Sequence, residues 1–174
     1  MRKYVLFYIG FCLLLINCNE DKASTAIKET QEQIDAKTIT QKEISDLKYA
    51  DFGLSADSQT AVNDWQKYQE LTTHIEALKK ADLNFFSTER LLLKTFFLEF
   101  RTEMPVNLQT NEILARITAL DTKAQKLNSL LRLNNIEKQN KIVAIKELLV
   151  AVSNLNLQIN KKFEFEKNNV IKSE

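Results

Sequence analysis

The sequence predicts an all-α protein, an up-down four-helix bundle that follows a polar N-terminal tether. Glycine occurs only at positions 10 and 53, and proline only at position 105. Strands and hairpins need turn residues at short intervals, many of them with positive φ, and this chain has almost none. The remaining sequence is rich in Leu, Lys, Glu, Gln, Ala and Ile, and most of these residue types favour helices.

The N-terminus has the pattern of an export signal. Arg2 and Lys3 are basic, and residues 4–16 form an apolar run without charge. This run is too short for a membrane span of about 20 residues but suits the core of a signal peptide. The alternatives are an uncleaved anchor and a buried core helix. We expect residues 1–17 to be a signal peptide.

The residues around the second cysteine suggest a lipoprotein. Leu15-Ile16-Asn17-Cys18 resembles the lipobox of bacterial lipoproteins, in the looser form found in the Bacteroidota. Residues 18–22 are similar to the acidic stretch that directs such lipoproteins to the outer face of the outer membrane, and residues 111–162 are similar to small helical flavobacterial lipoproteins of unknown function. The resemblance implies cleavage before Cys18, lipid on that cysteine and a surface-exposed rather than periplasmic location.

A polar segment follows the cysteine. Residues 19–46 contain eleven charged residues, and their only large aliphatic residues are isoleucines at positions 27, 34, 39 and 44. Burial of so few apolar side chains cannot offset the entropy of folding. We therefore expect residues 18–48 to be the lipidated cysteine and a tether, helical or disordered, and residues 49–174 to be the bundle domain.

The first two helices follow from apolar residues at three- and four-residue steps. The first is expected at 57–81, with Ser55 or Asp57 as its N-cap. The second is expected to start at a cap on Ser87, with Phe86 and Leu91 forming a hydrophobic staple, and to end at Pro105. The apolar face of the first helix consists of Val62, Trp65, Tyr68, Leu71 or Thr72, Ile75 and Leu78.

The last two helices are longer. Thr110 or Asn107 can cap the third, whose apolar residues step by four and three and form a coiled-coil-like seam. The fourth continues from Ile142 to Phe163. Within it, residues 154–160 alternate apolar and polar as a strand would, but helix is favoured because no turn or partner strand is available. The seam consists of Ile113, Ile117, Leu120, Ala124, Leu127 and Leu131.

The sequence offers little for catalysis. With one histidine and two cysteines the chain lacks the ligands of a zinc site, and without glycine loops it cannot cradle a nucleotide. The formal net charge of +1 gives no basic surface for nucleic acid. His74 and Glu70 could share a metal, and Glu99 and Glu103 could form an acid–base pair, but a packed histidine and a solvated helix face are the favoured interpretations. We predict no catalytic residue, metal or cofactor.

Five phenylalanines form the other candidate site. They could line a pocket for an apolar ligand or form an exposed docking patch, or they could simply fill the core, which we favour. Adjacent residues on a helix point about 100° apart, so one member of each adjacent pair is expected near the surface. The cluster is Phe85, Phe86, Phe96, Phe97 and Phe100.

These observations favour a non-enzymatic function. The hypothesis is a lipid-anchored helical module that binds another envelope protein or supports a membrane complex. The alternative is a carrier that holds a small, lipid-like apolar molecule between its helices. Neither function involves nucleic acid or a nucleotide.

Overall fold

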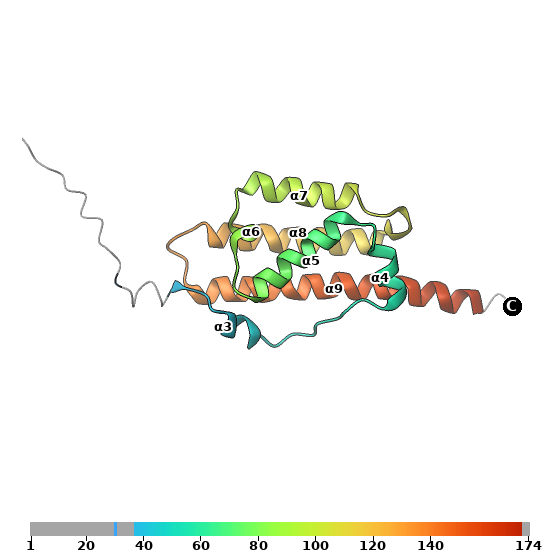
Figure 1. The fold of residues 1–174 in the computed structure, drawn as a ribbon, viewed down its shortest axis with the longest axis horizontal. Helices are drawn as coiled ribbons and strands as arrows, with labels where there is room; N and C mark the ends of the chain where they lie inside the picture. Colours follow the sequence, from blue (N-terminus) through green and yellow to red (C-terminus); the bar gives the residue numbers. More distant parts are fainter. Residues whose placement is uncertain (1–29, 31–36, 172–174) are drawn as a thin grey trace, which may run out of the picture. The chain divides into compact units, whose positions relative to one another are not determined.

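The computed structural model describes residue 30 and residues 37–171, with side chains as far as Asn169. The predicted signal peptide, Cys18 and most of the tether lie outside these residues. No strand occurs in the described part of the chain, which confirms the all-α class (Figure 1). The elements are α3 (Gln41–Ser45), α4 (Ala56–Val62), α5 (Gln66–Lys79), α6 (Asn84–Ser87), α7 (Arg90–Thr102), the 3₁₀ turn η2 (Val106–Leu108), α8 (Asn111–Leu131) and α9 (Lys138–Ile171).

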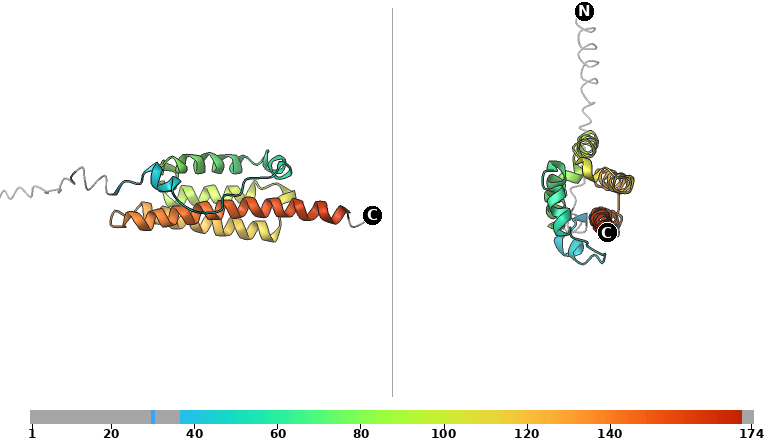
Figure 2. Two further views of the ribbon diagram at one scale, coloured as in Figure 1. Left: turned by 90° about the horizontal axis from the view of Figure 1, so that it is seen from below. Right: turned by 90° about the vertical axis from the view of Figure 1, so that its right-hand side faces the viewer.

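The two longest helices, α8 and α9, pair side by side as an antiparallel hairpin (Figures 1 and 2). The first five residues of the predicted seam are buried, and Leu131 packs at the edge of the core. Thr110 caps α8 as predicted, because its hydroxyl accepts a hydrogen bond from the amide of Ile113 at 3.3 Å. Residues 154–160 are helical, and of their apolar members Leu155 and Ile159 are fully buried, whereas Leu157 is partly exposed.

Helix α7 packs against α5 and α8 and ends before Pro105, as predicted. Its start differs from the prediction. Ser87 is the last residue of α6, Glu89 precedes α7 without a side-chain cap, and Leu91 is 71% exposed. The expected cap and hydrophobic staple are therefore wrong. The buried Asn128 explains the difference, since its Nδ2 donates to two backbone carbonyl oxygens of this connection and holds the chain there in a turn.

The predicted helix at 57–81 is broken into α4 and α5. Ser55 caps α4 by accepting a hydrogen bond from the amide of Ser58 at 3.3 Å, as predicted. The break falls at 63–65, where Trp65 is fully buried and its Nε1 donates to the carbonyl of Phe100 at 3.1 Å. This bond to the last turns of α7 fixes the bend. The three- and four-residue periodicity of the sequence could not predict the bend, because it depends on a distant residue.

The packed part of the chain begins earlier than predicted. Ile39 and Ile44 are buried in the common core, and the compact unit runs from Ala36. Thr40 and Glu43 form a capping box on α3, and Glu43 is also paired with Lys138 of α9 at 2.8 Å. The expected tether therefore cannot extend to residue 48. The sequence could not identify these two isoleucines as core residues, because their burial depends on packing against α5 and α9.

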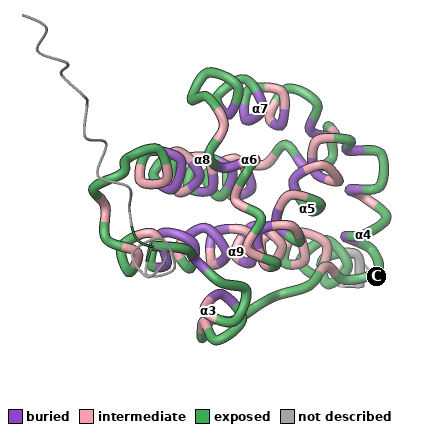
Figure 3. The backbone as a smooth tube through the Cα atoms, turned by 60° about the vertical axis from the view of Figure 1, so that its left-hand side comes forward, coloured by how far each residue is buried: buried purple, intermediate pink, exposed green. Residues whose placement is uncertain are grey.

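The buried surfaces of these helices form one core. Stretches of α5, α7, α8 and α9 are buried, and the connections between helices are mostly exposed (Figure 3). Val62 of α4, Trp65 in the break before α5, and Leu93 and Phe97 of α7 are all fully buried in this core. The core leaves the outer face of α7 uncovered.

Candidate functional site

The five predicted phenylalanines do lie together, two on α6 and three on α7. Ring centroids are 5.0 Å apart for Phe85 and Phe96, 5.4 Å for Phe96 and Phe97, and 6.1 Å for Phe97 and Phe100. All except Phe85 are buried. Phe96 and Phe97 can both be inside because α7 contacts α5 on one side and α8 on the other. The expectation that one of each pair lies near the surface holds for Phe85 but is wrong for the pair on α7.

His74 lies at the edge of this cluster. Its ring stacks on Phe85 with a centroid distance of 3.6 Å and an interplanar angle of 7°. Burial lowers the pKa of His74, and the nearby carboxylates of Glu70 and Asp82 oppose that shift. Glu70 instead accepts a hydrogen bond from Lys67 at 2.9 Å. Within 37–169, no group of three His, Cys, Asp or Glu side chains is placed to hold a metal ion.

Of the two glutamates considered as a carboxylate pair, Glu99 lies on α7 and Glu103 directly follows its last residue. Glu99 forms an ion pair with Lys67 of α5 at 3.0 Å, and the Lys67 Nζ also lies 5.4 Å from the ring centroid of Phe96. The hydrogen bonds to Glu70 and Glu99 raise the pKa of Lys67. Glu103 is exposed. These contacts give Glu99 a role in joining two helices.

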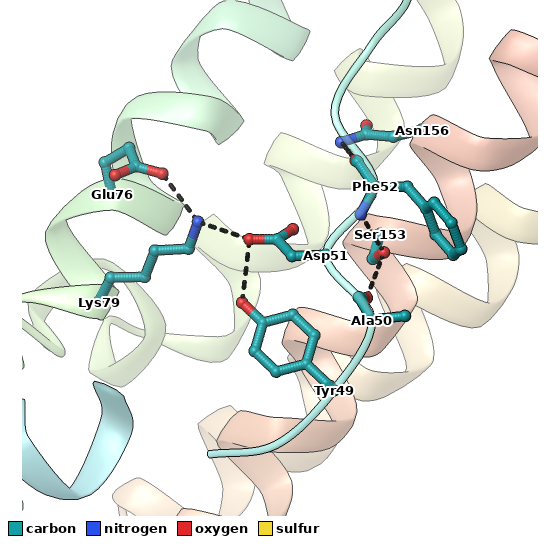
Figure 4. Close-up of polar contacts among 8 residues, drawn as sticks. All are labelled: Tyr49, Ala50, Asp51, Phe52, Glu76, Lys79, Ser153 and Asn156. Atoms are coloured by element: carbon teal, nitrogen blue, oxygen red, sulfur yellow. Dashed lines mark hydrogen bonds and ion pairs between the residues drawn. The ribbon is translucent and has the colours of Figure 1, made fainter. Parts of the chain in front are cut away.

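A second polar feature was not predicted. Residues 47–55, which we call the strap, run in an extended path between α3 and α4 along α9 (Figure 4). Ser153 of α9 donates to the carbonyl of Ala50 at 2.7 Å and accepts from the amide of Phe52 at 2.8 Å. Asn156 donates to the carbonyl of Phe52 at 2.9 Å. Ser153, Asn156 and Asn160, which we call the polar ladder, thus bind the backbone of the strap.

The third residue of the polar ladder, Asn160, binds the end of the strap. Asn160 donates to the carbonyl of Gly53 at 2.8 Å and accepts from the amide of Ser55 at 2.8 Å. Tyr68 of α5 donates to the Oδ1 of Asn156 at 2.7 Å, so the ladder also joins α5 to α9. Burial raises the pKa of Tyr68. The spacing of the three ladder residues, three and then four positions, is the signal that could have identified them as one face of a helix.

Charged residues hold the other side of the strap. Asp51 accepts from the hydroxyl of Tyr49 and from the Nζ of Lys79, both at 3.3 Å, and Lys79 is also bound to Glu76 at 3.0 Å (Figure 4). Beneath them is a cavity of about 90 Å³, with Tyr68 and Leu155 among its lining residues. The strap is thus fastened to α5 and α9, and the ladder recognises its backbone rather than its side chains.

The outer face of α7 is apolar and uncovered. Leu91, Leu92 and Leu98 are 71%, 60% and 64% exposed, and Val106 in the following turn is 84% exposed. Single exposed leucines are common on soluble proteins, but several on one short helix form a patch that marks an interaction site. The sequence alone did not indicate this surface, because the exposed Leu92 and the buried Leu93 are adjacent residues of the same type.

Helix α9 has a further property that bears on membranes. The stretch Lys138–Asn169 is long and apolar enough to cross a membrane by length and composition, with a mean hydropathy of 1.5 in its most apolar window. Half of that window is buried within the packed unit. The central helix of a soluble bundle has the same character, so this observation is weak support for a membrane span.

Comparisons of the chain with known protein families, with characterised proteins and with solved structures find no match.

Proposed function

We propose that the protein is a non-enzymatic, lipid-anchored helical module of the outer membrane, with its domain on the outward side, that binds a protein partner through the outer face of α7. The residues around Cys18 support the anchor, and the exposed leucines of α7 support the binding role. In this proposal α5, α7, α8 and α9 are the four helices of an up-down bundle, and α3, α4 and α6 are short additions to it.

The exposed leucines of α7 are the observation that carries the binding role. The opposite side of the same helix is fixed by Leu93, Phe97 and Phe100, which are all fully buried. A partner would therefore meet apolar side chains on a backbone that is already ordered. Because binding then costs little additional conformational entropy, even a small patch can contribute affinity.

The anchor would hold this surface close to the envelope. Each buried methylene of an acyl chain contributes about 0.8 kcal/mol, so one chain gives marginal binding, whereas two or more give a stable anchor. We expect Cys18→Ser to move the protein from the membrane fraction to the soluble or the inner-membrane fraction. Retention of this variant in the outer membrane would contradict the anchoring proposal.

The binding role is tested by recovering the tagged protein from detergent-solubilised membranes. We expect the wild-type chain to recover a partner in stoichiometric amount, and a second, untagged copy of the chain counts as such a partner. We expect the double variant Leu91→Gln, Leu98→Gln to lose this partner. Val143→Gln is the matched control, because Val143 is 44% exposed on α9, away from this face. Equal recovery with the double variant and the control would refute α7 as the binding surface.

A carrier of an apolar ligand is the second candidate, and the aromatic cluster favours it. Phe86, Phe97 and Phe100 are fully buried, however, and their neighbouring rings lie within contact distance. A ligand would have to displace these rings. Native mass spectrometry of the purified protein distinguishes the candidates, since a carrier would retain a lipid-like molecule.

A further inference from the structure

The exposed face of α7 carries charge on both sides of its apolar stripe. The stripe is formed by Leu91, Thr95, Leu98 and Thr102, at steps of four, three and four residues, and all four side chains are exposed. At about 100° per residue, basic residues lie along one edge of this stripe and acidic residues along the other. The basic edge is Arg90, Lys94 and Arg101, of which Arg101 is already paired with Asp121 of α8 at 3.2 Å, and the acidic edge is Glu99 and Glu103, with Leu92 between these two glutamates.

We propose that the partner of this face is a second copy of the chain, with the two α7 helices packed parallel about a two-fold axis. This proposal rests on the binding role proposed for α7. In a parallel pair the basic edge of each helix faces the acidic edge of the other, whereas in an antiparallel pair like edges meet. The distribution of charge on α7 thus selects the parallel arrangement.

Individual residues fit this arrangement. In a parallel, in-register pair, Leu91 and Leu98 each face the same residue of the other copy, and Lys94 comes close to the Glu99 five positions further along the other helix. The side chain of Glu99 is 45% exposed, so it can accept a second cation beside Lys67. In an antiparallel pair Lys94 would instead approach Arg101, a contact between like charges.

The threonines of the stripe are compatible with burial between two helices. The hydroxyl of Thr102 already donates to the carbonyl of Leu98 at 3.0 Å, so covering it leaves no unpaired donor. In the heptad that places Leu91 and Leu98 at d, Thr95 and Thr102 take the a positions. Threonine shares the β-branched shape of isoleucine and valine, which at a with leucine at d favour two-stranded parallel packing.

The parallel arrangement also suits an anchored protein. Helix α7 begins at the same end of the packed unit as α3, as Figure 1 shows. Two copies related by an axis along α7 therefore present both α3 helices at the same end of the pair. Both chains could then continue to the same membrane, which an antiparallel pair would hinder.

The pair is expected to be weak in dilute solution. A helix of 13 residues offers much less surface than the roughly 1,200–2,000 Å² buried in a stable complex. Confinement of two copies to one membrane raises their effective concentration and would offset this weakness. Cross-linking in the native membrane is therefore the appropriate test.

The test introduces one cysteine into the full chain and treats membranes with a short bis-maleimide. We expect Leu98→Cys to cross-link with itself, and Leu91→Cys likewise, each at several times the yield of Val143→Cys on α9. If α7 paired antiparallel with Lys94 near Arg101, Leu98→Cys would still cross-link because it lies near the centre of such a pair, but Leu91→Cys would not cross-link with itself. That outcome, or a yield for Leu98→Cys no higher than for Val143→Cys, would overturn the proposal.

The parent chain separates this inference from the anchoring proposal. Its only cysteines are Cys12 and Cys18, and it should not cross-link if the first is removed and the second acylated. If the parent does cross-link, the anchoring proposal fails, and α7 is tested in the Cys12→Ser, Cys18→Ser background. If an unrelated partner is recovered but Leu98→Cys does not cross-link, the self-association proposal fails and the binding role stands.

Charge exchange gives an independent readout. In the Leu98→Cys background, we expect Lys94→Glu to lower the cross-linking yield severalfold because it faces the partner's Glu99. Co-expression with a copy that carries Leu98→Cys and Glu99→Lys should restore the mixed dimer. Thermal unfolding of each variant controls for the loss of the Lys67 ion pair. No change with Lys94→Glu would contradict the parallel arrangement.

Discussion

Replacement of Ser153 by alanine tests how firmly the strap is held on α9. The side chain of Ser153 is 1% exposed and makes two hydrogen bonds to the strap backbone, one as donor and one as acceptor. An intramolecular hydrogen bond contributes about 0.5–1.5 kcal/mol net, so loss of both should lower the free energy of unfolding by about 1–3 kcal/mol.

Ser129→Ala is the matched control for this variant. Ser129 is exposed on α8, and its hydroxyl donates only to the carbonyl of Gln125 one turn earlier, at 2.9 Å. Both substitutions gain the same helix propensity, about 0.5 kcal/mol, because both replace serine by alanine within a helix. The difference between the two variants therefore isolates the contribution of the strap contacts.

Urea denaturation followed by circular dichroism measures this difference. With a denaturant slope of about 2 kcal/mol per molar urea, Ser153→Ala should unfold at about 0.5–1.5 M lower urea than Ser129→Ala. Hydrogen exchange adds a local readout, since the amide of Phe52 should lose protection in Ser153→Ala alone. Coincident urea midpoints with unchanged exchange at Phe52 would refute the role assigned to the ladder.

Three further predictions concern side chains that link elements. Asn128→Asp places a carboxylate against two backbone carbonyl oxygens, and an unpaired buried charge of this kind should cost about 3 kcal/mol or more in urea denaturation at pH 8, with partial recovery at pH 5. The pKa of His74 is lowered from 6.5, so the unfolded chain binds its proton more readily. Unfolding free energy should therefore fall as the pH drops below 6.5, with a smaller fall in His74→Gln. Bonds from Lys138, and then from the Thr40 cap, lower the pKa of Glu43 to about 2. The stabilisation it gives is present above pH 4.5 and is lost as the pH falls through 2, and an NMR titration should show a higher pKa in Lys138→Met.

Local signals in the sequence were sufficient for the helices and for part of the capping. The seam on α8, the Thr110 and Ser55 caps and the stop before Pro105 all depend on neighbouring residues, and the structure confirms them. The helix prediction for residues 154–160 was also correct, because an isolated strand there would have had no partner strand. These features follow from periodicity and hydrogen bonding within one or two turns.

Features that depend on distant residues were missed. The turn at 87–89 is set by Asn128, forty positions later, and the bend before α5 is set by the bond from Trp65 to α7. Burial of Ile39 and Ile44 needs the surface of α9. The exposed leucines of α7 could not be distinguished from core leucines, since Leu92 and Leu93 are adjacent and only one of them is buried.

The state of the N-terminus in the native protein tests the account most directly. Intact-mass spectrometry of the protein purified from its own membranes should give a chain that begins at Cys18 and carries the mass of two or three acyl chains. A chain that begins at Met1, with an unmodified thiol on Cys18, would contradict the anchor and the membrane-bound function built on it.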